Sequence, residues 1–153
     1  MIAVGERAPD FVLKDQDGKD FKLSSFKGKR VLLSFRPLAW TPVCTDQMSG
    51  LEQNFDRFKA LNTVAVGIGV DSSASNKAWA KSQNIQKTRL LADFWPHGEV
   101  ASLYGLFRQQ DGFSERANVV VDEDQVIVFA KLYPIQELPE PDEIIKFLQG
   151  REK

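Results

Sequence analysis

Cysteine and histidine are nearly absent from this chain of 153 residues, which contains one of each, Cys44 and His97. A single cysteine cannot form a disulfide within the chain, so an oxidised sulfur would be an oxyacid or would be bonded to another molecule. The same scarcity argues against a zinc site, which needs several thiolate or imidazole ligands. We expect no metal and no cofactor, because the glycines of residues 66–70 lie within an expected strand and do not open a helix as a phosphate-binding loop does.

The chain also lacks an excess of charge of either sign and lacks long apolar runs. Its 20 basic and 21 acidic residues give a net charge of −1, which provides no general attraction to nucleic acid or to an anionic membrane. No stretch approaches the roughly 20 apolar residues of a membrane span, and residues 1–7 lack the apolar core of a signal peptide. We therefore expect a cytoplasmic protein that binds neither nucleic acid nor membrane.

The length and the hydrophobic pattern predict a single α/β domain over residues 1–153. A chain of this length can bury roughly 70% of the surface of its unfolded state. Continuous apolar runs at 31–35 and 64–70 are typical of buried strands, and the Asp-Gly pair within 15–18 predicts the turn of an N-terminal β-hairpin. Because expected strands and helices alternate, we expect a sheet with helices on its faces. The other expected elements are helices at 44–62, 72–83, 99–104 and 141–149, a strand that starts at Leu90, and a hairpin of 119–121 with 126–132.

The expected helix of residues 44–62 has one apolar face, because its apolar residues recur at steps of three and four. These residues are Met48, Leu51, Phe55, Phe58 and Leu61, and Cys44 lies on the same stripe. A lone cysteine in such a position is most often a small buried hydrophobic residue.

Cys44 also lies at the point where a buried strand passes into this helix. Thr41 suits the N-cap, where its hydroxyl can accept a backbone hydrogen bond, and Pro42 suits the first helical position because it has no N–H. Cys44 is then the third helical residue, close to unpaired backbone N–H groups and to the positive end of the helix dipole. This local structure favours a thiolate, so a reactive cysteine is the alternative to a buried one.

The helix terminus alone cannot activate such a thiol fully. An unperturbed cysteine has a pKa of about 8.5, and lowering that value by about 2 units takes roughly 2.7 kcal/mol. A helix N-terminus supplies about 0.3 to 1 kcal/mol, or about 2 kcal/mol when it is partly buried. The remainder calls for a cation. His97 is one candidate, and an arginine from another strand is a better one because it is always charged and offers a rigid fork of donors.

Pro37, Thr41 and Cys44 have the spacing Pro-x-x-x-Thr-x-x-Cys. This spacing resembles the active-site motif of the peroxiredoxins, the AhpC/TSA family, and Arg116, just before an apolar run, is similar to their active-site arginine. The similarity in order and spacing covers nearly the whole chain and is greatest to the short one-cysteine AhpE-like branch. The segments that carry it are 37–41, 91–98, 101–105 and 116–122.

The resemblance implies a thioredoxin-like fold with an N-terminal β-hairpin and a central mixed sheet flanked by helices. It also implies a thiol-dependent peroxidase that reduces hydrogen peroxide, organic hydroperoxides or peroxynitrite. In that reading Cys44 attacks the peroxide and becomes a sulfenic acid. Thr41 orients the peroxide, and Pro37 shields the thiolate. Arg116 stabilises the thiolate and the charge that develops on the peroxide oxygens.

Each of these residues also has a purely structural reading. Cys44 can be a buried hydrophobic residue, Pro37 can end a strand, and Thr41 can be an ordinary N-cap. Arg116 can be a surface charge in a loop, and Arg36, in the strand before the motif, is a weaker rival for its role.

Gln47 departs from the family pattern, in which an acidic residue is common three positions after the cysteine. A neutral amide can still accept a hydrogen bond from arginine, but it provides no charge pairing. We therefore expect Gln47 to affect how firmly Arg116 or Arg36 is held, more than the chemistry itself.

The loop of residues 94–98 contains two aromatic residues and His97. A hydrolase-type dyad of His97 with the cysteine is one alternative, but the two residues lack a characteristic spacing and a third orienting group. The resemblance instead implies that this loop lies near the rim of the active site and the subunit interface. Trp40, Phe94 and Trp95 could form an apolar collar, the contact surface of a homodimer, or part of the core. We expect a homodimer.

Because the chain has no second cysteine, an external thiol has to reduce the sulfenic acid through a mixed disulfide. That donor could be thioredoxin, a glutaredoxin-like or mycoredoxin-like protein, or a low-molecular-weight thiol. Two other functions stay open at this point. One is a redox-responsive binding or signalling protein that uses Cys44 oxidation without significant turnover, and the other is a purely structural, slowly reacting thiol.

Overall fold

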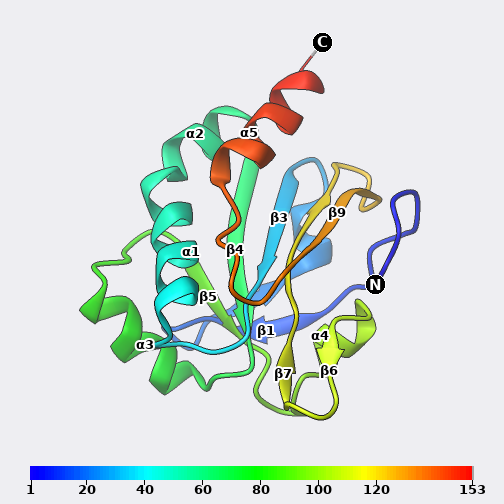
Figure 1. Ribbon diagram of the computed structural model, residues 1–153. Coiled ribbons are helices and arrows are strands. Elements are labelled where there is room, and N and C mark those ends of the chain that lie inside the picture. Colours follow the sequence, from blue (N-terminus) through cyan, green and yellow to red (C-terminus); the bar gives the residue numbers. More distant parts are fainter. Residues whose placement is uncertain (153) are drawn as a thin grey trace.

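The computed structural model describes residues 1–152, so the expected domain of residues 1–153 includes one residue, Lys153, outside the described part (Figure 1). Its centre is a seven-stranded sheet with the strand order β2-β1-β5-β4-β3-β8-β9. β3, β4 and β5 run parallel, whereas β1, β2, β8 and β9 pair in antiparallel fashion with their neighbours. The expected mixed sheet is confirmed. The strands are β1 (Val12–Lys14), β2 (Asp20–Lys22), β3 (Arg30–Phe35), β4 (Thr63–Gly69), β5 (Arg89–Ala92), β6 (Phe107–Arg108), β7 (Phe113–Ser114), β8 (Arg116–Val121) and β9 (Ile127–Tyr133).

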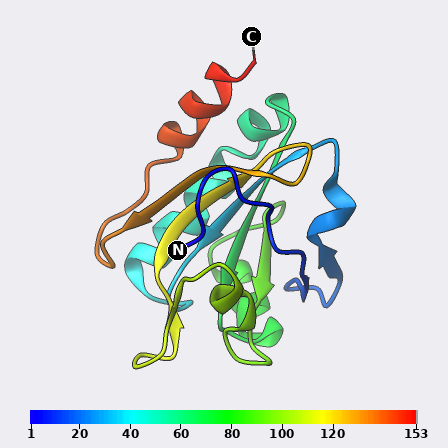
Figure 2. The ribbon, with the colours of Figure 1, turned by 90° about the vertical axis from the view of Figure 1, so that its right-hand side faces the viewer.

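Helices cover both faces of the sheet, as the alternating pattern predicts. α1, α2, α3 and α5 contribute to one apolar cluster, and α4 with the N-terminal segment contributes to another on the opposite face. Figure 1 shows α1, α2 and α3 on one side of the sheet, and in Figure 2 α4 and the N-terminal segment lie in front of it. The helices are α1 (Pro42–Gln53), α2 (Phe55–Ala60), α3 (Ser73–Ser82), α4 (Glu99–Leu103), α5 (Pro141–Gly150) and a short 3-10 helix, η1 (Leu23–Phe26).

The N-terminal β-hairpin is confirmed. Leu13 pairs with Phe21 across β1 and β2. Gly18 in the turn has a φ of +76°, a conformation that glycine adopts without a steric penalty. The hairpin joins the large sheet where Lys14 pairs with Ala92 of β5.

The prediction of one continuous helix over 44–62 is wrong, because α1 ends at Gln53 and α2 begins at Phe55. The side-chain Nδ2 of Asn54 donates to the carbonyl of Gly50 at 2.8 Å. An asparagine side chain that bonds locally to the backbone competes with helix continuation. The apolar stripe is nevertheless real, since Met48, Leu51 and Phe58 are buried.

Two glycines of β4, Gly67 and Gly69, allow close packing against the strand. A Cβ at Gly67 would lie 2.2 Å from the sulfur of Met48, and a Cβ at Gly69 would lie 2.4 Å from Nη1 of Arg36. A larger residue at Gly67 would therefore displace the side chain of Met48, and a larger residue at Gly69 would displace that of Arg36.

Two small features were not expected. β6 and β7 form a separate two-stranded sheet, and η1 follows the N-terminal hairpin. Strands of two residues are too short to show a periodic pattern. Within the described residues, no helix has both the length and the apolar character needed to cross a membrane.

Candidate active site

Cys44 is the third residue of α1 and is completely buried, with 0% of its surface exposed. Pro42 opens the helix, and Thr41 takes the N-cap position with an extended backbone. The expected capping bond from Thr41 is absent, which corrects the sequence-based view of its side chain. Its hydroxyl instead donates to the carbonyl of Leu38 at 2.8 Å, within the loop that joins β3 to α1.

Arg116 reaches the sulfur from the neighbouring strand. It is the first residue of β8, and Ala117, the next residue, pairs with Phe35 at the end of β3. Arg116 Nη1 lies 3.2 Å from Cys44 Sγ, and its Nε donates to the carbonyl of Ile135 at 2.8 Å. Only 2% of Arg116 is exposed. The guanidinium therefore points inward, and the alternative of a surface charge is wrong.

Gln47 holds the same guanidinium. Its Oε1 accepts from Arg116 Nη1 at 2.7 Å, so the expectation that a neutral amide can accept from arginine is confirmed. Its Nε2 donates to Ser34 Oγ at 2.7 Å and to the carbonyl of Phe35 at 3.2 Å. Since a carbonyl can only accept and an arginine can only donate, both contacts fix the same orientation of the amide.

Arg36 is engaged elsewhere in the core. Its guanidinium donates to Asp71 Oδ2 at 2.8 Å and to Asn76 Oδ1 at 2.9 Å, and it lies 4.6 Å above the ring of Trp79. Burial lowers the pKa of Arg36, and the ion pair with Asp71 opposes this shift. Of the two candidate arginines, it is thus Arg116 whose hydrogen bond reaches the sulfur.

Asp71 also fixes the loop before α1, a role that the sequence did not indicate. Its Oδ2 accepts from the backbone N–H of Ala39 at 2.8 Å. The next residue, Trp40, has a φ of +73°, which is uncommon for a large side chain, and its Nε1 donates to Ser75 Oγ at 3.1 Å. A signal was present, because Asp71 directly follows the apolar run of residues 64–70, most of which forms β4.

The opening beside Cys44 is small and apolar. A cavity of about 240 Å³ lies over the start of α1, and Arg116 forms part of its wall. Cys44 itself is fully buried and does not line the cavity, but Arg116, whose Nη1 contacts Cys44 Sγ, does. The other residues that line the cavity are Pro37, Leu38, Thr41, Pro42, Val43, Phe113, Ile135 and Gln136.

His97 does not pair with the cysteine. Its Nε2 donates to the carbonyl of Gly112 at 2.7 Å. This bond joins the loop before α4 to the turn between β6 and β7. Phe94 and Trp95 are exposed, by 49% and 82%, and so is Trp40 by 53%. The alternative that these aromatic residues belong to the core is therefore wrong.

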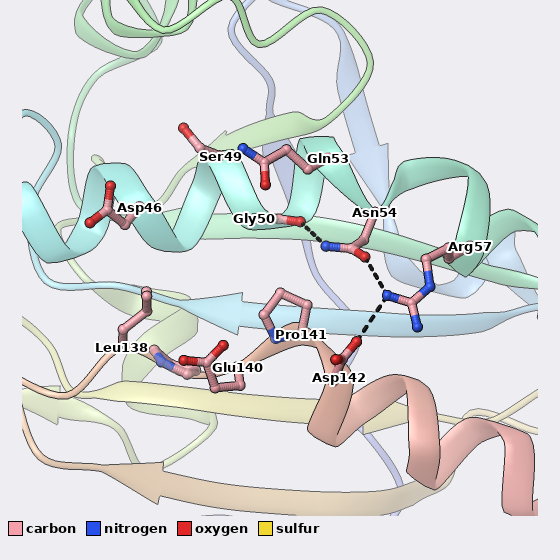
Figure 3. Close-up of a pocket in the computed structure, with 11 residues that line it drawn as sticks. Asp46, Ser49, Gly50, Gln53, Asn54, Arg57, Leu138, Glu140, Pro141 and Asp142 are labelled. Atoms are coloured by element: carbon pink, nitrogen blue, oxygen red, sulfur yellow. Dashed lines mark hydrogen bonds and ion pairs between the residues drawn. The ribbon is translucent and has the colours of Figure 1, made fainter.

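A larger polar pocket, of about 440 Å³, lies between α1 and the start of α5 (Figure 3). Arg57 lies at one end of it and donates to Asn54 and Asp142, each at 2.9 Å. Its walls include neither Cys44 nor Arg116. We therefore place the candidate site at the smaller, apolar cavity.

Comparison with known proteins agrees with this geometry. The model of the AhpC/TSA family matches residues 4–130. Alkyl hydroperoxide reductase E of Mycobacterium tuberculosis is 39% identical over 133 residues, which cover 86% of each chain. The chloroplastic peroxiredoxin Q of Suaeda salsa is 34% identical over 150 residues, which cover 97% of this chain and 69% of the relative.

Solved structures show the same fold. The reduced 2-Cys peroxiredoxin of Plasmodium vivax superposes with a TM-score of 0.90 at 27% identity, covering 99% of this chain and 83% of that one. Peroxidoxin BcpB from Mycobacterium tuberculosis superposes with a TM-score of 0.87 at 24% identity, over the full length of both chains, and supports the fold alone. The thioredoxin-like fold and the resemblance to the AhpE-like branch are thus confirmed, and the chain belongs to the AhpC/TSA family, the peroxiredoxins.

Proposed function

We propose that Cys44 is the reactive thiol of a peroxidase that reduces hydrogen peroxide, organic hydroperoxides or peroxynitrite. The observation that carries the proposal is the 3.2 Å contact between Arg116 Nη1 and Cys44 Sγ at the N-terminus of α1. Helix terminus and guanidinium together supply the positive charge that the sequence required for a thiolate. Membership in the peroxiredoxins supports this assignment.

In the proposed reaction, the Cys44 thiolate attacks the distal oxygen of the hydroperoxide. The S–O bond forms as the O–O bond breaks, so Cys44 becomes a sulfenic acid. The leaving oxygen takes a proton from solvent and departs as water or alcohol, and with peroxynitrite the leaving group is nitrite. Arg116 stabilises the charge on the oxygens as the bond breaks. The Thr41 hydroxyl already donates to Leu38, so its lone pairs are free to accept from the peroxide O–H. Pro37, in the cavity wall, has no N–H that could compete for the thiolate.

We further propose that an external thiol completes the cycle. The chain has one cysteine, so the Cys44 sulfenic acid would condense with a thiol of another molecule, release water, and be reduced by a second thiol. Thioredoxin, a glutaredoxin-like or mycoredoxin-like protein, and a low-molecular-weight thiol all fit this chemistry. A catalytic thiol that must be regenerated suits a reducing compartment, which supports the expected cytoplasmic location.

A homodimer is the proposed assembly. Trp40 is exposed in the loop before α1, Phe94 and Trp95 are exposed in the loop after β5, and aromatic residues are enriched at protein interfaces. Burial of these side chains against a second copy would remove a large apolar area from water.

Repeated consumption of peroxide tests the function against the signalling alternative. Purified protein is mixed with hydrogen peroxide in large excess, with and without a reducing thiol, and the remaining peroxide is followed over time. We expect many turnovers per Cys44 when the thiol is present and one when it is absent. A redox-responsive binding protein would also form a sulfenic acid, but it would consume about one equivalent in both cases.

A further inference from the structure

Arg116 is one end of a buried chain of hydrogen bonds that leads away from the thiol. Arg116 donates to Gln47 Oε1, and Gln47 Nε2 donates to Ser34 Oγ at 2.7 Å. Ser34 Oγ then donates to Asn118 Oδ1 at 2.8 Å. Ser34 and Asn118 are direct partners across β3 and β8, so the sheet register brings their side chains together. All four residues are buried.

The chain continues through β9 to the first turn of α5. Asn118 Nδ2 donates to the hydroxyl of Tyr133 at 3.5 Å, the longest of these contacts. The Tyr133 hydroxyl donates to Glu143 Oε1, and the other carboxylate oxygen of Glu143 accepts from Lys131 Nζ at 2.6 Å. A path of polar side chains thus connects the reactive thiol to a carboxylate at the surface.

Every donor in this path points in the same direction. Arg116 can only donate and an ionised Glu143 can only accept, so each residue between them accepts from one neighbour and donates to the next. Burial raises the pKa of Tyr133, and the bond to Glu143 adds to this rise, so the hydroxyl stays a donor. Hydrogen bonds from Lys131 and Tyr133 outweigh burial and lower the pKa of Glu143, which therefore stays an acceptor.

Within the described part of the chain, Arg116 has no direct carboxylate partner. Its hydrogen-bond partners within residues 1–152 are the Cys44 sulfur, the Gln47 amide and the Ile135 carbonyl. The negative charge nearest along the path is Glu143, at the far end. Chains of hydrogen bonds polarise one another in a medium of low dielectric constant.

We propose that Glu143 is a positioning residue for Arg116, acting through Tyr133, Asn118, Ser34 and Gln47. The carboxylate fixes the direction of the Tyr133 hydroxyl, and the directions of the Asn118 amide and the Ser34 hydroxyl follow from it. Ser34 then holds the Gln47 amide together with the Phe35 carbonyl, which accepts from the same Nε2. At the end of the chain, Gln47 presents its oxygen to Arg116, which keeps Nη1 on the Cys44 sulfur. An effect of Glu143 on peroxide reduction rests on the proposed function. Its effect on the reactivity of the Cys44 thiol does not.

The test reads the thiol directly. The ultraviolet absorbance of the Cys44 thiolate and its rate of alkylation by iodoacetamide are measured at neutral pH in the wild type, Glu143→Gln and Tyr133→Phe. We expect both variants to lose roughly twofold to tenfold in alkylation rate, the worth of one neutral hydrogen bond. Glu143→Gln leaves one acceptor oxygen for both Lys131 Nζ and the Tyr133 hydroxyl and turns an NH₂ donor toward one of them, whereas Tyr133→Phe removes the hydroxyl. The double variant should lose no more than the larger single effect, because both changes break the same chain.

Asp142→Asn is the matched control. It removes the same charge from the adjacent position of α5, but Asp142 pairs with Arg57 and does not contact Tyr133. We expect it to leave the alkylation rate at the wild-type value. A loss as large as that of Glu143→Gln would show a general effect of charge on α5 and would overturn the proposal, as would wild-type rates in both chain variants.

Gln47→Glu tests whether the effect of Glu143 travels through Gln47. A carboxylate at this position would accept from Arg116 and from Ser34, so the proton of Ser34 would turn away from Asn118 and the chain would be interrupted. In this background Glu143→Gln should no longer change the alkylation rate, and an undiminished effect would contradict the proposed path. If the wild type alkylates rapidly but does not reduce peroxide, the proposed function fails while this test remains valid.

Discussion

The guanidinium of Arg116 lies 3.2 Å from the sulfur of Cys44, although 72 residues separate them in the sequence. The sheet creates this contact, because β8 pairs with β3 and begins beside the place where β3 passes into the active-site loop. A buried cation and a helix N-terminus thus lie beside one thiol.

Cys44→Ser should abolish peroxide reduction and leave the fold intact. Serine is nearly the same size as cysteine and suits the first turn of a helix, but it cannot form a sulfenic acid. Peroxide turnover with a thiol donor and a thermal unfolding curve measure the two effects. Retained turnover in a folded variant would remove Cys44 from the mechanism.

Arg116→Lys should slow the reaction of Cys44 with peroxide, and Arg116→Ala should slow it about a hundredfold or more. Lysine keeps the charge, but it cannot contact Cys44, Gln47 and the Ile135 carbonyl with a planar fork. Rapid-mixing kinetics with hydrogen peroxide provide the measurement. Arg89→Lys is the control, since Arg89 pairs with Asp15 at the N-terminal hairpin. Equal rates for wild type and Arg116→Ala would exclude Arg116 as the activating cation.

Glu52→Gln should weaken the fold near neutral pH and make it less sensitive to acid. Burial alone would raise the pKa of Glu52, but hydrogen bonds led by that from the Gln86 backbone N–H outweigh it, so the pKa is lowered from 4.5. A carboxyl with a lowered pKa stabilises the fold above its ordinary value, and this contribution disappears as the pH falls through the folded-state pKa. We expect a loss of about 1 to 2 kcal/mol in unfolding free energy at neutral pH.

Chemical denaturation at several pH values measures this effect. The difference between wild type and Glu52→Gln should shrink as the pH falls below 4.5. A difference that stays constant over this range would show that the charge of Glu52 does not contribute.

Trp95→Glu should turn the proposed homodimer into a monomer. Trp95 is 82% exposed in the single chain, and a charge in its place would oppose burial against a second copy. Sedimentation velocity at micromolar concentration distinguishes the two states. Lys19→Glu, in the N-terminal turn, controls for the change in charge. A wild-type protein that is monomeric under these conditions would contradict the proposed assembly.

Much of the fold could be predicted from the sequence, because its signals are local. The apolar runs of β3 and β4, the turn at Gly18 and the first turn of α1 each appear within a few residues. The break at Asn54 could not be predicted in this way, since the apolar stripe continues through it and the hydrogen bond from the Asn54 side chain to Gly50 leaves no trace in the apolar pattern.

The site was only partly predictable, because its geometry depends on strand pairing. Cys44 and Thr41 lie close in sequence, and the resemblance drew attention to Arg116. Asp71, two residues after β4, and Asn118 of β8 come near Cys44 only through strand pairing, so a local pattern can mark Asp71 as a polar residue after a buried run but cannot connect either residue with the thiol. The direction of the Thr41 hydroxyl likewise depends on the turn at Leu38 and not on helix propensity.

The most direct test of the central claim is a single-turnover reaction of reduced protein with one equivalent of hydrogen peroxide. Rapid mixing gives the second-order rate constant, and mass spectrometry after trapping with dimedone identifies the product. We predict a rate constant far above that of free cysteine at the same pH, and a sulfenic acid on Cys44 that persists until a thiol is added. A rate equal to that of free cysteine, or an unmodified Cys44, would contradict the account.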